Sequence, residues 1–171
     1  SEDDAIRGVV KMQEDVGLQA VTDGEFRRDY WHLDFLGTFK GIEISDETYG
    51  MKFQGGNQVG TPYVHGKIGD NEGPMREHFK FVKAATTRTA KHCIPAPGMV
   101  YLRGGRKGVS EQAYPDLDKF WEDLITAYRH EVKALEALGC TYLQFDDTSL
   151  AYLCDANFRE SVKKRGDDPD K

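Results

Sequence analysis

A single pattern occurs twice in this chain: a stretch with helical spacing, a glycine, a short apolar stretch and then acidic residues. In the first copy, residues 18–22 precede Asp23-Gly24-Glu25, and in the second, residues 141–145 precede Asp146-Asp147. Acidic residues at the carboxyl ends of strands, in repeated helix–strand units, are typical of active sites in parallel α/β barrels. The pattern therefore predicts an α/β fold and indicates an enzyme.

Composition narrows the class further. The 171 residues are 39% hydrophobic and 30% charged, which suits one packed domain spanning 1–171. A net charge of −6 without a concentrated basic face argues against nucleic-acid binding. No apolar run approaches 18 residues and no signal-peptide pattern follows Ser1, so we expect no membrane partner. Three cysteines without a paired framework fit the reducing cytoplasm.

The chain is too short to form a complete barrel. A closed (β/α)8 barrel usually needs about 250 residues, and this chain has 171. We therefore expect the N-terminal and central part of a TIM barrel, a fragment that starts within a helix and stops before a final element. An incomplete barrel exposes an apolar strand edge, so we also expect either self-association, as a homo-oligomer, or remaining chain.

The other elements follow from periodicity and punctuation. Residues 37–73 are rich in glycine and in extended stretches, which predicts an antiparallel β insertion between barrel units. The expected helices are 1–16, one opening at Pro74, 116–138 and 149–164, and the expected strands are 18–22, 91–94 and 141–145.

Asp23 and Glu25 flank a glycine, so the backbone turns tightly and the two side chains can converge. A carboxylate pair suits acid–base chemistry or the binding of a substrate ammonium group. A helix cap plus a salt bridge to Arg27 or Arg28 is an equally good interpretation of the local sequence. The position at a strand end favours the functional one.

Asp146 and Asp147 also have two interpretations. One of them is expected to cap the helix that begins near Leu150. Asp146, nearer the strand, is the better candidate to point into the barrel mouth.

Histidine and cysteine residues invite a metal interpretation. The chain lacks His-x-Cys, Cys-x-x-Cys and His-Glu-x-x-His motifs. His92 and Cys93 are adjacent on an expected strand, so they point to opposite faces and make poor partners for one ion. We expect an ordinary histidine and a buried thiol there, and small core side chains at Cys140 and Cys154.

Several motifs closely resemble the cobalamin-independent methionine synthase family, in particular short single-barrel bacterial proteins similar to its C-terminal catalytic domain. The resemblance runs over nearly the whole chain. The motifs are Val21-Thr22-Asp23-Gly24-Glu25-Phe26-Arg27-Arg28, Pro97-Gly98-Met99-Val100-Tyr101-Leu102-Arg103, Leu143-Gln144-Phe145-Asp146-Asp147 and Leu150-Ala151-Tyr152-Leu153-Cys154.

The resemblance implies a TIM barrel whose zinc ion activates a thiol for methyl transfer. The methyl donor would be polyglutamyl 5-methyltetrahydrofolate and the acceptor homocysteine. By motif, Glu25 and Asp146 correspond to the family's amino-acid clamp, with Asp23 and Asp147 beside them as further substrate-binding candidates. No catalytic residue is assigned.

The family's zinc ligands are a His-x-Cys motif, a glutamate and a further cysteine, all expected downstream of Lys171. This chain alone is therefore expected to bind no zinc and to lack activity. Two alternatives stay open: a zinc enzyme that alkylates another thiol, such as coenzyme M with an epoxide, or a non-catalytic amino-acid-binding fragment.

Overall fold

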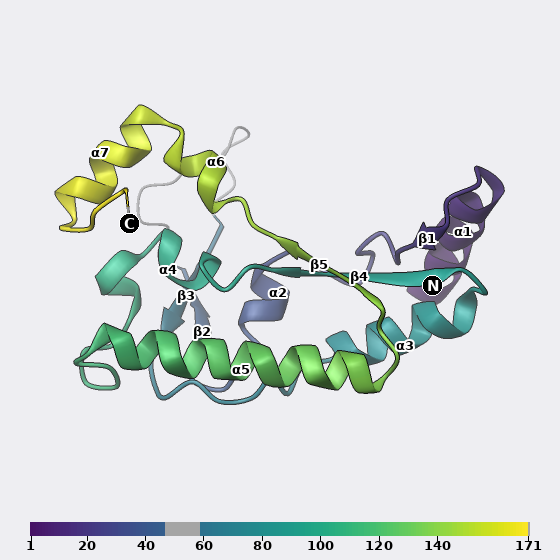
Figure 1. Cartoon of the computed structure of the whole chain (residues 1–171), viewed down its shortest axis with the longest axis horizontal. Coiled ribbons are helices and arrows are strands. Elements are labelled where there is room, and N and C mark those ends of the chain that lie inside the picture. Colours follow the sequence, from purple (N-terminus) through teal and green to yellow (C-terminus); the bar gives the residue numbers. More distant parts are fainter. Residues whose placement is uncertain (47–58, 171) are drawn as a thin grey trace.

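The computed structural model describes residues 1–46 and 59–170 of this mixed α/β chain (Figure 1). In chain order the elements are α1 (Glu2–Asp15), β1 (Ala20–Val21), α2 (Leu33–Leu36), β2 (Ile42–Ser45), β3 (Thr61–Val64), α3 (Met75–Ala85), β4 (Thr89–Pro95), α4 (Met99–Leu102), a 3-10 turn (Gly105–Gly108), α5 (Leu117–Ala137), β5 (Tyr142–Asp146), α6 (Ser149–Leu153) and α7 (Ala156–Lys164).

The central sheet has three strands in the order β1-β4-β5, and both pairings are parallel. The expectation that the first and last of these strands lie in one parallel sheet is confirmed. Within the described ranges these strands form an open sheet, so the closed barrel stays a prediction, as does the single domain. Strand β1 is shorter than the expected 18–22, because its pairing with β4 covers only Ala20 and Val21 and leaves Leu18 half exposed.

Both helices that precede an acidic strand end on a glycine, as expected. Gly17 follows α1 with φ +89° and Gly139 follows α5 with φ +81°, a left-handed conformation that glycine adopts without steric cost. In each case the next residue returns a hydrogen bond into the helix: Leu18 N–H donates to Gln13 at 3.0 Å, and Cys140 N–H donates to Leu135 at 3.0 Å. The glycine thereby turns the chain back toward the sheet.

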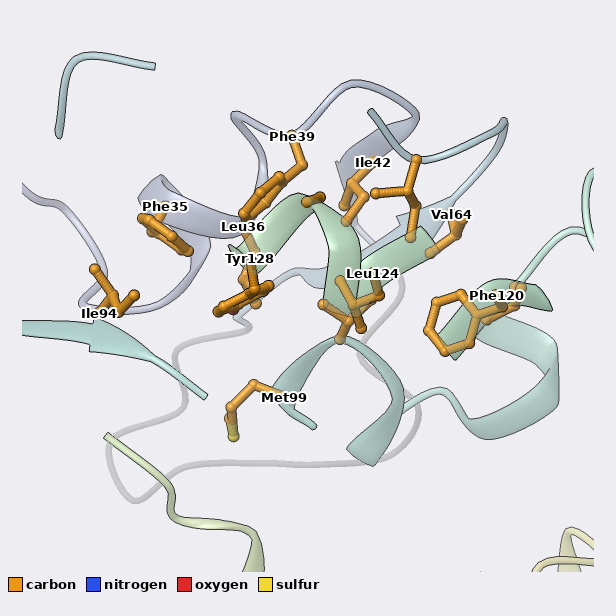
Figure 2. Close-up of a cluster of buried hydrophobic side chains, with 14 of the residues drawn as sticks. Phe35, Leu36, Phe39, Ile42, Val64, Ile94, Met99, Phe120, Leu124 and Tyr128 are labelled. Atoms are coloured by element: carbon orange, nitrogen blue, oxygen red, sulfur yellow. The ribbon is translucent and has the colours of Figure 1, made fainter. Parts of the chain in front are cut away.

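Helix α5 runs along one face of β4 and β5 (Figure 1). The Tyr128 hydroxyl donates to the Pro95 carbonyl at 2.9 Å, so the helix is tied to the end of β4. Figure 2 shows Phe35, Phe39 and Tyr128 in the main core, where Phe39 and Tyr128 stack with centroids 5.2 Å apart. The expected packing of this helix on the outside of the sheet is confirmed.

Other expectations needed partial correction. The insertion at 37–73 contains the antiparallel pair β2–β3, with Ile42 opposite Val64, while residues 47–58 lie outside the described part. The helix expected over 149–164 is two helices, because the chain breaks at Cys154 and the Asp155 side chain caps α7 by accepting from Phe158 N–H at 2.7 Å.

Among the described residues, no helix has the length and apolar character needed to cross a bilayer.

Candidate functional site

The two faces of β4 have different surroundings. His92 and Ile94 are buried toward the helices, and the His92 ring meets Phe79 edge-to-face with centroids 5.8 Å apart. Cys93 lies on the opposite face, in register with Gln144 of β5, and is only partly buried. The expectation that His92 and Cys93 point to opposite faces is confirmed.

Glu25, Cys93 and Asp146 converge on this second face. One carboxylate oxygen from each acid and the Cys93 sulfur all lie within 4.8 Å of one another. The three residues come from the carboxyl-terminal ends of neighbouring strands: the turn after β1, the end of β4 and the last residue of β5. We expected the two carboxylates to lie within about 8 Å of each other, a span that one ammonium bridges, and this geometry is confirmed.

The turn after β1 sets the direction of Glu25. Gly24 has φ +65° and Glu25 itself has φ +59°, so two successive residues adopt the left-handed conformation. The Asp23 side chain is buried and accepts a hydrogen bond from Glu25 N–H at 2.9 Å. Asp23 therefore stabilises the turn and lies outside the three-residue cluster.

The second acidic pair divides as the sequence suggested. Asp147 is exposed and accepts from the N–H of Ser149 at 2.9 Å, at the start of α6. Asp146 is held in place by its backbone carbonyl, which accepts from Ala96 N–H at 3.0 Å, and by the Gln144 amide, which donates to its carboxylate. Asp146 joins the cluster, whereas Asp147 bonds the first N–H of α6, whose N-cap position is Thr148.

Arg28 joins the turn to β4. Its side chain is 2% exposed, and one guanidinium nitrogen lies 3.2 Å from the Glu25 carboxylate. The other nitrogen donates to the Cys93 carbonyl at 2.8 Å. The salt bridge that the sequence suggested between Glu25 and Arg28 thus coexists with the cluster. Arg27 instead pairs with Glu2 and Asp3 on α1.

Burial is the main cause of the pKa shifts in the cluster. It raises the pKa of Glu25; Asp146 and Asp23 act in the same direction and Arg28 opposes them. Burial, with Asp146 next, also raises the pKa of the Cys93 thiol, so that thiol keeps its proton at neutral pH. A raised carboxylate pKa was expected from repulsion between facing acids, but desolvation contributes more.

Cys93 is the member of the cluster that sequence reasoning missed, since it was interpreted as a buried thiol. A signal was present: the residue lies two positions before Pro95, near the end of a strand, like the acids on either side. The motifs placed Glu25 and Asp146 together, but only the strand register places a sulfur between them.

The class of protein is α/β, and its candidate site lies at the carboxyl edge of a parallel sheet, where proteins of this class commonly bind ligands. The cobalamin-independent synthase catalytic domain matches residues 2–164. The chain therefore belongs to the cobalamin-independent methionine synthase family, as its motifs indicated.

Two curated relatives show how far the similarity extends. The uncharacterized protein YxjH of Bacillus subtilis is 34% identical over 171 residues, covering 99% of this chain and 45% of the relative. The 5-methyltetrahydropteroyltriglutamate–homocysteine methyltransferase of Thermosynechococcus vestitus is 28% identical, covering 86% of this chain and 19% of that protein. The chain thus spans less than half the length of these relatives.

A solved structure supports the same assignment. The crystal structure of the putative vitamin-B12-independent methionine synthase from Listeria monocytogenes superposes with a TM-score of 0.74 at 34% identity. The match covers 98% of this chain and 52% of that one. The described α/β arrangement is therefore the arrangement of this family.

Proposed function

We propose that this chain is part of a methyltransferase that moves a methyl group from 5-methyltetrahydrofolate to the thiol of homocysteine. In this proposal Glu25 and Asp146 bind the ammonium group of the amino acid. The observation that carries the proposal is the convergence of two carboxylates and a sulfur within 4.8 Å, at the ends of three neighbouring strands. The methyl donor and acceptor are inferred from the name of a relative in the same family.

An ammonium group matches this arrangement. It has three N–H donors, and acceptors around one nitrogen stand about 4.5–5 Å apart when each hydrogen bond is about 2.8–3.3 Å long. Glu25 and Asp146 would each accept a charge-assisted hydrogen bond, and the Cys93 sulfur is a weak third acceptor. The reaction forms a sulfur–methyl bond, breaks the donor's carbon–nitrogen bond and leaves the thiol proton with the donor. The residues of this chain orient the acceptor for that step.

Zinc, which the family resemblance implies, would supply thiol activation when bound. The cluster in this chain does not fit it, because the buried Arg28 guanidinium already places a positive charge beside Glu25 and donates a hydrogen bond to its carboxylate. We therefore expect ligands outside these 171 residues to hold zinc.

The negative charge of the cluster also bears on the alternative acceptor, coenzyme M. Coenzyme M carries a sulfonate, which two carboxylates would repel, so an acceptor with an ammonium group is favoured over it. A non-catalytic amino-acid-binding protein would bind homocysteine equally well. Methyl transfer by the full-length protein, measured as methionine formed from homocysteine and methylfolate, distinguishes binding from catalysis.

The direct test is calorimetric titration of homocysteine into Glu25→Gln and Asp146→Asn variants. Each substitution should weaken binding by about 1.5–3 kcal/mol, the usual contribution of a charged hydrogen bond, which is roughly 10- to 150-fold. Folding should change little in Asp146→Asn, because that carboxylate lies outside the core. Glu25→Gln should cost more stability, because it removes the carboxylate that pairs with the buried Arg28 guanidinium. Asp147→Asn is the matched control and should leave affinity unchanged, since Asp147 lies outside the cluster and bonds the N–H of Ser149.

The same titration has a predicted pH dependence. The pKa of Glu25 is raised by burial, and only its ionised form attracts an ammonium, so affinity should fall as pH drops through that pKa. Unchanged affinity in both cluster variants would mean that the strand-end acids are structural and that the substrate binds elsewhere.

A further inference from the structure

The cluster of Glu25, Cys93 and Asp146 has the composition of a metal site as well as of an ammonium site. Carboxylate and thiolate groups are zinc ligands, and a small rearrangement would bring the three atoms to metal-bonding distances of about 2.0–2.3 Å. The ligand atoms alone therefore do not select the occupant. The selection depends on the charge beside them.

Arg28 supplies that charge. Its side chain is 2% exposed, and its guanidinium is always protonated. It donates to the Glu25 carboxylate at 3.2 Å and to the carbonyls of Trp31 and Cys93 at 3.2 and 2.8 Å. These bonds fix the guanidinium between the turn after β1 and the end of β4, so its position does not depend on a ligand.

The charge count then distinguishes the two occupants. The Glu25, Asp146 and Asp23 carboxylates bring three negative charges to this centre and Arg28 and Lys91 bring two positive ones, which leaves a net charge of −1. One ammonium brings this total to zero. A divalent ion would leave an excess positive charge beside the buried Arg28 guanidinium and would compete with its hydrogen bond to the Glu25 carboxylate, which is costly in a partly buried site.

We infer that Arg28 is the residue that determines specificity at this site, making it select a primary ammonium over a divalent metal ion. The inference rests on the proposed function for the identity of the ammonium ligand. Arg28 is also a positioning residue, because it orients Glu25 and holds that carboxylate in its ionised form. Its neighbour Arg27 points the other way, to α1, and has no part in this role.

Several groups face this centre and contribute to its titration. Asp23 and Asp146 act on Glu25 together with Arg28, and Lys91 on β4 acts on the neighbouring Cys93. Two histidines face Arg28 from the helix side: His92 on β4, whose pKa burial lowers to about 4, and His78 on α3, whose pKa burial also lowers. Both are therefore neutral near pH 7, so Glu25 is the member of the cluster whose charge should respond to Arg28.

The experiment compares Arg28→Gln, which removes the charge, with Arg28→Lys, which keeps it, and with Arg27→Gln as the matched control. The first readout is the Glu25 pKa, measured by NMR on the ¹³C-labelled carboxyl group. Removing the charge should raise this pKa by about one unit or more, the scale of an adjacent cation. The Lys variant and the Arg27 variant should stay close to wild type.

The second readout is homocysteine affinity as a function of pH. In Arg28→Gln the acid limb of the profile should move to higher pH by the same amount as the Glu25 pKa. A merely structural role would lower affinity equally at every pH, without moving the limb, and that result would overturn the inference.

The third readout is cobalt binding. Wild type and Arg28→Lys should show no thiolate-to-cobalt absorption band with Co²⁺, whereas Arg28→Gln should gain one. The band should be absent from the double variant that combines Arg28→Gln with Cys93→Ser. A band of equal strength in wild type, or none in Arg28→Gln, would contradict the assigned selectivity.

Two controls keep the outcomes separate. If Arg28→Gln fails to fold, the test rests on Arg28→Lys. The inference is overturned if the acid limb of the homocysteine affinity profile in Arg28→Lys does not coincide with that of wild type. If wild type binds no homocysteine, the proposed function fails, while the Glu25 pKa and the cobalt spectra still test what Arg28 does.

Discussion

At the scale of single residues, Glu25 has an unfavourable backbone conformation. Within 1–46 and 59–170 it is the one non-glycine residue with a positive φ, at +59°. That conformation costs a side-chain-bearing residue about 1–2 kcal/mol. Such strain is found where the surrounding structure holds a functional group in a required direction. Here the Asp23 side chain and Arg28 hold the turn.

This backbone strain predicts that glycine is a more stable replacement for Glu25 than alanine. Glu25→Gly should be more stable to urea than Glu25→Ala by about 1 kcal/mol, because glycine adopts positive φ without a Cβ clash. Both variants lose the same carboxylate and the same contact with Arg28, so the comparison isolates the backbone. Both should bind homocysteine poorly in calorimetry. Equal stability of the two variants would show that the turn is unstrained.

At the scale of elements, glycines in and after α1 have opposite roles. Gly8 lies inside the helix, and a Cβ built there meets nothing within 4 Å. Gly17 has equally open surroundings, but its φ of +89° is one that other residues adopt at a cost. The space is the same at both positions and only the backbone differs.

Two alanine substitutions should therefore shift stability in opposite directions. Gly8→Ala should raise the free energy of unfolding by about 0.5–1 kcal/mol through helix propensity. Gly17→Ala should lower it by about 1 kcal/mol through strain at the helix end. Each change corresponds to roughly 2–4 °C in Tm by calorimetry. A stabilising Gly17→Ala would contradict the assigned role of this glycine in turning the chain toward β1.

At the scale of the whole molecule, β5 is an edge strand in the described sheet. Tyr142 and Phe145 are 44% and 46% exposed. Phe145 also lines an apolar cavity of about 350 Å³ together with Pro97 and Ile125. An apolar edge with unpaired backbone groups favours pairing with another strand.

We therefore expect the 171-residue chain to self-associate through this edge. Sedimentation velocity should show concentration-dependent species larger than a monomer at micromolar concentrations. Phe145→Lys should shift the distribution toward monomer, because a charge at an edge opposes strand pairing. Val16→Lys is the control, since Val16 is 72% exposed but lies beyond the end of α1. A monomer at all concentrations would contradict this expectation.

Local patterns accounted for much of the fold. Helical spacing predicted α5 within one residue at each end and predicted the start of α1 within one residue, because Ser1 is its N-cap. These features succeed because caps, glycine stops and amphipathic stripes act over a few neighbouring residues. The continuous helix over 149–164 failed for the same kind of reason: Asp155 starts a new helix there.

The sequence by itself indicated that acids stand at the ends of β1 and β5, and it favoured Asp146 over Asp147 as the residue that faces the site. Tertiary structure decided which other groups join them. Cys93 enters the cluster because the register sets it opposite Gln144, next to the end of β5. Arg28 is tied to β4 by its hydrogen bond to the Cys93 carbonyl. Strand pairing joins residues far apart along the chain, and local periodicity contains no information on which of them will meet.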